Sequence, residues 1–92
     1  MNASATAQRI NRAAQLVSQL VVAAPHDTTL PIILKQLHFL QEVYERDQSF
    51  LAVPSSRVTL GVIAAKEDYD TIHPELAGLL HEISYAIKHQ AG

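Results

Sequence analysis

Apolar side chains recur every three or four residues through long stretches of this chain, and a proline lies at or beside one end of each stretch. This spacing places the apolar side chains on one face of an α-helix, so it predicts amphipathic helices. The first helix is expected over residues 4–24, ending before Pro25, because proline has no N–H to donate and disfavours helix in the residue before it. The second is expected over residues 30–46, with Pro31 in its first turn. The short loop between them predicts an antiparallel helical hairpin. The two stripes consist of Ile10, Ala13, Ala14, Val17, Leu20, Val21 and Ala24, and of Leu30, Ile33, Leu34, Leu37, Leu40 and Tyr44.

The stretch 57–68 admits two interpretations. Its β-branched run, residues 58–62, is typical of a buried strand. A lone strand, however, has nothing to pair with in an otherwise helical chain. Helical spacing also relates Val58, Val62, Ala65 and Tyr69, so a helix is the better prediction, although Gly61 within it costs about 1 kcal/mol relative to alanine. A glycine there would let a neighbouring helix approach closely.

Two further segments complete the expected fold. Residues 47–56 are predicted to be a connection, with Phe50 and Leu51 tucked over the core, and residues 70–74 a second connection. Residues 74–89 predict the last helix, with Pro74 and Glu75 suited to its first turn. The expected fold class is therefore all-α: a small antiparallel bundle of about four helices that forms one domain over residues 1–92.

The composition of the chain indicates the cellular compartment in which the bundle is expected to act. The 92 residues are 48% hydrophobic and 17% charged and include no cysteine. A chain this apolar is globular rather than disordered, and a small domain without disulfides favours a reducing compartment. The first residues lack a charged region followed by an apolar one, and the most apolar stretch, residues 16–24, is too short to span a bilayer. We therefore expect a cytoplasmic protein with no membrane partner.

Charge is distributed unevenly along the chain. The net charge is −2, which argues against nucleic acid as a partner. Residues 1–41 carry three basic side chains against one acidic one, whereas residues 42–92 carry four against eight. Between Lys66 and Lys88 there are five acidic residues and no basic one. This block, which includes Tyr69, is either a solvated face or a patch directed at a basic partner.

No pattern in the chain predicts chemistry. His38 and Glu42 are one helical turn apart, but His73, His81 and His89 are eight residues apart and rotate away from one another on a helix. No metal-ligand motif, serine-nucleophile elbow or glycine-rich phosphate loop is present. We therefore expect no catalytic residue, no metal and no cofactor, and a protein that is not an enzyme.

Two runs of residues carry a family resemblance. Residues 57–67, read as Arg-Val-Thr-Leu-Gly-Val-Ile-Ala-Ala-Lys-Glu, and residues 73–76, read as His-Pro-Glu-Leu, together resemble a family of type VI secretion immunity proteins. Members of that family protect bacteria from an NAD(P)+ glycohydrolase effector by binding its toxin domain and covering the catalytic cleft. The resemblance extends over nearly the whole chain, and residues 68–72 depart from it. It implies an all-helical fold, action in the cytosol and a cognate effector toxin domain as partner.

An interface of this kind depends on a few aromatic and charged anchors. The expected partner-binding residues are Glu67, Asp68, Tyr69, Asp70 and Glu75, with a second candidate patch formed by Glu42, Tyr44, Glu45 and Asp47. Simpler interpretations also stand, because Lys66 and Glu67 suit a helix surface pair and Gly61 suits packing.

A second function remains possible on the sequence alone. The alternative is a helical adaptor or antitoxin-like protein-binding module, for which a homodimeric bundle is the expected form. An exposed apolar stripe that includes Leu16 and Val22 would favour it. Whether the free chain self-associates is left open.

Overall fold

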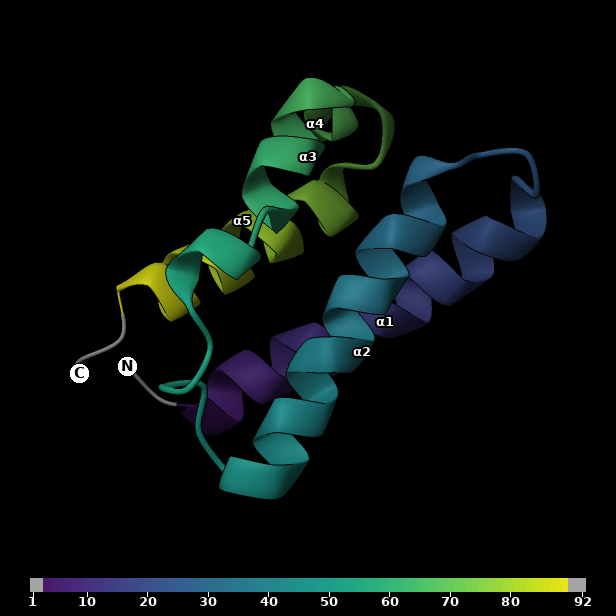
Figure 1. Cartoon of the computed structure of the whole chain (residues 1–92). Coiled ribbons are helices and arrows are strands. Elements are labelled where there is room, and N and C mark those ends of the chain that lie inside the picture. Colours follow the sequence, from purple (N-terminus) through teal and green to yellow (C-terminus); the bar gives the residue numbers. More distant parts are fainter. Residues whose placement is uncertain (1–2, 90–92) are drawn as a thin grey trace.

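The computed structural model describes residues 3–89, apart from the side chain of Ser55, as five α-helices and one 3₁₀ turn. Figure 1 shows two long helices side by side and a group of shorter ones laid against them. No strand occurs within the described range, so the prediction of an all-α fold is confirmed. The elements are α1 (Ala3–Ala23), α2 (Thr29–Asp47), η1 (Ser55–Arg57), α3 (Leu60–Lys66), α4 (Tyr69–Ile72) and α5 (Pro74–Lys88).

Helices α1 and α2 form the expected hairpin. The loop between them holds the cap of α2, because Asp27 Oδ1 accepts hydrogen bonds from the backbone N–H groups of Thr29 (2.8 Å) and Leu30 (3.0 Å). These are among the N–H groups that a helix cannot satisfy internally at its start. Further along, the Gln41 side chain donates to Asn11 Oδ1 at 2.9 Å and links the outer edges of the two helices.

Helix α5 runs antiparallel to α1. Arg9 pairs with Glu82 (2.7 Å) and Arg12 with Glu75 (2.9 Å), so residues later in α1 meet residues earlier in α5. The predicted start of α5 at Pro74 is confirmed, and its end at Lys88 is one residue short of the prediction.

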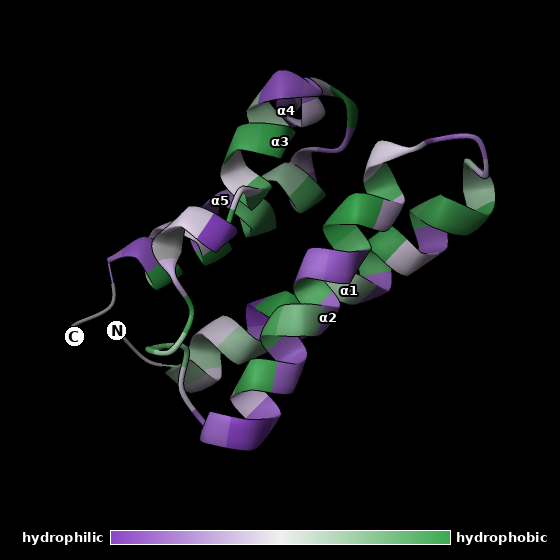
Figure 2. Ribbon diagram, in the orientation of Figure 1, coloured by the Kyte–Doolittle hydropathy of each residue, from purple (hydrophilic) through white to green (hydrophobic). Residues whose placement is uncertain are grey.

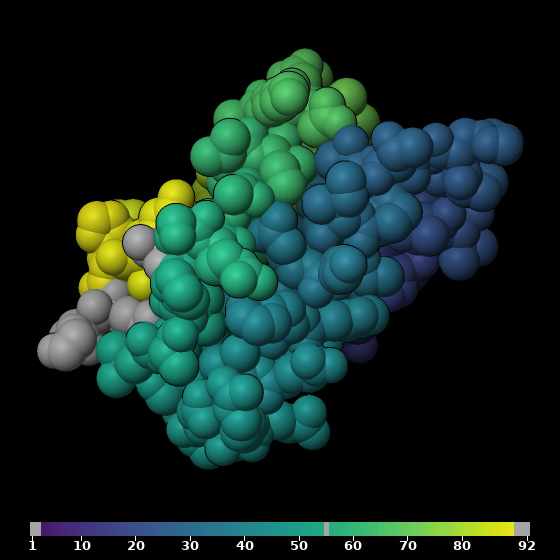
Figure 3. Space-filling model, viewed as in Figure 1, coloured from purple at the N-terminus to yellow at the C-terminus, as the bar shows by residue number. Residues whose placement is uncertain are grey.

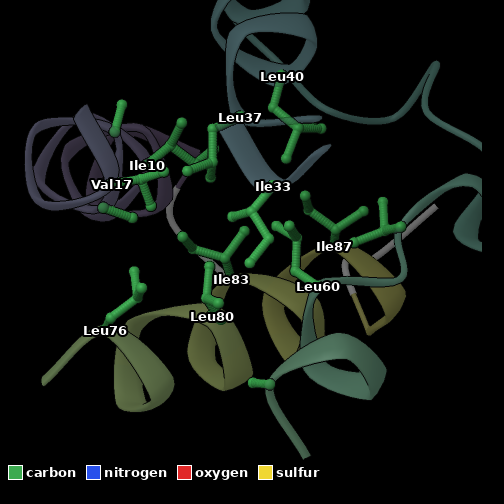
Figure 4. Close-up of a cluster of buried hydrophobic side chains, with 14 of the residues drawn as sticks. Ile10, Val17, Ile33, Leu37, Leu40, Leu60, Leu76, Leu80, Ile83 and Ile87 are labelled. Carbon is green, nitrogen blue, oxygen red and sulfur yellow. The ribbon is translucent and has the colours of Figure 1, made fainter. Parts of the chain in front are cut away.

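One hydrophobic core joins the hairpin to the shorter helices. Figure 4 shows apolar side chains of α1, α2, α3 and α5 pointing toward a common centre. The labelled residues are all nearly inaccessible to solvent: Ile10, Val17, Ile33, Leu37, Leu40, Leu60, Leu76, Leu80, Ile83 and Ile87. In the connection after α2, Phe50 is buried as expected, but the prediction for Leu51 is wrong, because its side chain is 58% exposed.

The predicted helix 57–68 is broken into shorter pieces. Arg57 belongs to a 3₁₀ turn, Val58 and Thr59 are not helical, and α3 begins only at Leu60. Near this start the N–H of Gly61 donates to the Oγ of Ser84 in α5 at 2.9 Å. The helix ends before Asp68, whose φ of 57° lies in the left-handed region. The expected connection at 70–74 is therefore partly helical, as α4.

Gly61 has the packing role that its sequence context predicted. A Cβ at this position would lie 3.3 Å from Ser84 Oγ and 3.4 Å from His81 Nδ1. Both atoms belong to α5, so the missing side chain lets α3 lie close against that helix. Ser84 itself is buried and accepts a hydrogen bond across the helix interface.

Candidate partner-binding surfaces

The acidic stretch predicted as an interface folds into a turn around α4. We call Glu67, Asp68, Asp70 and Glu75 the acidic turn. It lies at the same end of the molecule as the loop between α1 and α2, in the upper part of Figure 1, and Thr29 Oγ1 donates to Glu67 Oε1 at 2.5 Å across that junction. Figure 2 shows hydrophilic residues at this turn and again at the far end of α2.

Every carboxylate of the acidic turn has a neighbour within the chain. Asp68 Oδ1 accepts a hydrogen bond from Thr71 Oγ1 at 3.2 Å, and Glu75 Oε2 accepts two from Arg12, at 2.9 and 3.1 Å. Asp70 lies 3.6 Å from His81 Nε2, a distance that makes an ion pair only when the histidine is protonated. Asp68, Asp70 and Glu75 are nevertheless exposed, and Glu67 is half-buried. The turn therefore presents negative charge to solvent from a partly fixed arrangement.

Tyr69 lies beneath the acidic turn and not on its surface. Its side chain is only 4% exposed, and its ring meets the His73 ring edge-on, with 5.4 Å between centroids. Burial raises the pKa of the Tyr69 hydroxyl, and the nearby charges of Asp27 and Glu67 raise it further. Among the described residues this hydroxyl has no hydrogen-bond partner. The buried ring anchors α4 to the core, so the exposed carboxylates are the groups of this segment that a partner would meet first.

The second candidate patch lies at the other end of α2. Glu42, Glu45 and Asp47 are exposed, whereas Tyr44 is half-buried and stacks on Phe50 at 5.4 Å between ring centroids. A hollow of about 370 Å³ opens beside that ring. It is lined by Ala7, Ile10, Asn11, Gln41, Tyr44, Glu45 and Phe50.

Arg46 is engaged next to this hollow. It donates two hydrogen bonds of 3.1 Å to the carboxylate of Asp47. These bonds hold the pKa of Asp47 below its usual value and that of Arg46 above it. The two acidic patches lie at opposite ends of α2, a helix roughly 29 Å long, so they do not form one continuous site.

A third surface was missed in the sequence. We call it the α2 groove: a hollow of about 320 Å³ lined by Ile32, Lys35, Gln36, Phe39 and Arg57. It borders α2 on the side of η1, and Figure 3 views the molecule from the side where α2 and α3 are in front. Ile32 and Phe39 lie seven residues apart and both fall outside the apolar stripe of α2. These two apolar residues on the otherwise polar side of the helix are the sequence feature that could have indicated the groove.

Within residues 3–89, no group of three or more His, Asp or Glu side chains is arranged to hold a metal ion. The i, i+4 pair of His38 and Glu42 is exposed on α2. No helix in the same range is both long and apolar enough to cross a membrane.

Comparison with known proteins gives one finding. A family model described as Tsi6 matches residues 5–89, which includes nearly all of α1 and the whole of the other helices. No curated protein matches the chain, and no solved structure does.

Proposed function

The chain belongs to the Tsi6 family of type VI secretion immunity proteins, and on that premise we propose that it neutralises one cognate effector by binding its toxin domain one-to-one and covering the active site. The target we propose is an NAD(P)+ glycohydrolase. The chain acts as a single domain in the cytoplasm, and it performs no chemistry of its own. The family match over residues 5–89 is the observation that carries this proposal.

The segments that carry the resemblance also organise the fold. Residues 57–67 contain η1's last residue and all of α3, and residues 73–76 begin α5. Within them, Gly61 seats α3 against α5 through its bond to Ser84. These residues therefore support the family's fold, while target choice is expected to depend on the surfaces around them. The departure at residues 68–72 covers α4 and two residues of the acidic turn, Asp68 and Asp70, which supports a toxin-specific role for those two carboxylates.

We propose that the exposed carboxylates of the acidic turn contact basic side chains of the toxin. Charge complementarity of this kind sets association rate and partner choice more than affinity. Glu42 and Tyr44, at the far end of α2, are the second candidate contacts. Tyr69 is assigned the part of holding α4 in place beneath the carboxylates.

Reversing the charge of Asp68 and Asp70 to lysine tests the acidic turn. Glu67 is left intact, because its bond to Thr29 joins α3 to α2. The double variant is expected to slow association with the toxin domain about tenfold at low salt, measured by surface plasmon resonance. Glu82→Lys, an exposed acid on another face, is the charge control. Association at the wild-type rate would show that the turn is only a solvated face.

Co-expression with the toxin domain of the neighbouring effector gene tests the function itself. We expect a stable complex on purification and preserved cellular NAD+. A stable complex with no effect on NAD+ would keep the immunity role and reassign the toxin's chemistry. Absence of any complex, with both proteins expressed and folded, would contradict the proposal.

An adaptor or homodimeric module remains the second candidate, and one observation bears on it. Val22 is 83% exposed, as that alternative requires, but Leu16 is half-buried and packs against the core. The exposed apolar stripe on α1 is thus incomplete. Sedimentation of the free chain separates the two functions, because a stable dimer that persists in the presence of the toxin domain would favour the adaptor.

A further inference from the structure

We propose that the α2 groove is the docking surface for an apolar segment of the toxin domain flanked by acidic side chains. This inference rests on the proposed immunity function and specifies where and by what chemistry the partner is held. It concerns a surface that is distinct from the acidic turn.

The apolar side chains of the groove are exposed to solvent and do not belong to the buried face of α2. The buried face of α2 already supplies Leu30, Ile33, Leu37 and Leu40 to the core, whereas Ile32 is 54% exposed and Phe39 is 38% exposed on a different face. Both residues line the same hollow. A partner that covered them would remove apolar surface from water and provide the aromatic anchor on which such interfaces depend.

The charge of the groove indicates the nature of that partner. Lys35 and Arg57 line the hollow, and neither forms an ion pair with a carboxylate among residues 3–89. By contrast, the described ion pairs engage Arg9, Arg12 and Arg46. The guanidinium of Arg57 instead lies 5.7 Å from the centroid of the Phe39 ring, so cation and aromatic surface are presented together. Acidic side chains beside an apolar protrusion would complement both features.

Two hydrogen bonds between Gln36, which lines the groove, and Thr59 hold the groove in shape. The Gln36 amide donates to Thr59 Oγ1 at 2.8 Å and accepts from the Thr59 backbone N–H at 3.3 Å. This pair joins α2 to the segment between η1 and α3, and so fixes the position of Arg57 relative to Phe39. A surface arranged before binding loses less conformational freedom when the partner arrives.

The groove adjoins the acidic turn. Ile32 lies one helical turn after Thr29, whose hydroxyl donates to Glu67. One partner could therefore cover the groove and meet the acidic turn at its edge. Two cations are too few for a run of phosphates, which favours a protein partner over nucleic acid.

The test is calorimetric titration of the isolated toxin domain with four purified variants of the full chain. Ile32→Ser with Phe39→Ser removes the apolar surface, and Lys35→Glu with Arg57→Glu reverses the charge. Val22→Ser with Tyr85→Ser removes comparable exposed apolar surface elsewhere, at residues that are 83% and 61% exposed. Lys88→Glu is the charge control. Circular dichroism and sedimentation confirm the fold and state of each variant before titration, and Ile32→Ser alone is used if the double apolar variant unfolds.

We expect the apolar variant to bind the toxin domain about 30-fold or more weakly than wild type. The charge variant should bind about tenfold more weakly, and this difference in affinity should shrink as the salt concentration rises. Both controls should stay within about twofold of wild type. Wild-type affinity in both groove variants, with the wild-type complex intact, would overturn the groove assignment and leave the immunity function standing. If the wild-type chain did not bind the toxin domain, both the groove assignment and the immunity function would be overturned. A groove-dependent dimer of the free chain, unaffected by toxin, would assign the surface to a second copy instead.

Discussion

At the scale of single residues, the contact between Gly61 and Ser84 is where two helices are fitted together. The serine hydroxyl accepts the N–H of the glycine at 2.9 Å, at the start of α3 where that N–H has no partner within its own helix. Ser84→Ala leaves this half-buried N–H without its acceptor and should lower the free energy of unfolding by about 1–2 kcal/mol, measured by urea denaturation. Ser18→Ala, at an exposed mid-helix serine of α1, should change it by less than about 0.5 kcal/mol. Equal effects at both sites would mean that the bond contributes nothing.

Tyr69 makes a second prediction at this scale. Its pKa is raised by burial and by nearby negative charge, so the folded protein disfavours the tyrosinate more than the unfolded chain does. The contribution of the protonated Tyr69 hydroxyl to the free energy of unfolding is therefore fully present below the ordinary tyrosine pKa of about 10. It is lost as pH rises above that value toward the raised pKa of the folded protein. Tyr69→Phe should gain stability relative to the wild type between pH 9 and 11, measured by denaturation at each pH. Tyr85→Phe, at an exposed ring, is the matched control. A constant difference across that range would contradict the burial of the hydroxyl.

At the scale of elements, the start of α2 depends on one side chain in the preceding loop. Asp27 accepts two backbone N–H groups, whereas Thr28, the residue directly before the helix, makes no capping hydrogen bond through its side chain. Asp27→Ala should therefore lower the free energy of unfolding by about 1 kcal/mol, within the range measured for capping residues. Thr28→Ala should have an effect below about 0.5 kcal/mol. A larger loss at Thr28 than at Asp27 would show that the cap is assigned to the wrong residue.

The elements also show what the sequence could predict and what it could not. The apolar stripes of α1, α2 and α5 are long, and prolines mark their ends, so periodicity and the prolines together located these helices to within a few residues. The stretch 57–68 was harder, because its apolar spacing fits a continuous helix and does not show where the chain interrupts it. At the start of α3 the N–H of Gly61 bonds to Ser84 in α5, a contact between distant segments that spacing does not reveal. Asp68 ends the helical stretch with a positive φ, which aspartate adopts more readily than most residues but which no local pattern predicts here.

The same limit applies to the candidate surfaces. The four acidic residues between positions 67 and 75 were expected on the surface; three of them are exposed at the turn that the fold creates, and Glu67 is half-buried there. Tyr69 was grouped with them because it is adjacent in sequence, but the core takes its ring. The α2 groove depends on Arg57 lying over Phe39, residues from segments that only tertiary structure brings together.

At the scale of the whole molecule, one core and a few hydrogen bonds between helices set the arrangement of the surfaces of this 92-residue chain. A single apolar core joins the five described helices, while hydrogen bonds from Gln36 and Thr29 of α2 reach Thr59 and Glu67, the residues on either side of α3. The exposed ion pairs between α1 and α5 add little by comparison, since such pairs contribute at most about 1 kcal/mol. The surfaces left free around this core are the ones assigned to the toxin.

The most direct test of the immunity function is titration of the isolated toxin domain with the full chain while NAD+ hydrolysis is followed. Inhibition by one-to-one occlusion predicts that the rate falls in proportion to added chain and reaches zero at one equivalent, when the toxin concentration is well above the dissociation constant. Undiminished hydrolysis in the presence of excess folded chain would contradict the central claim.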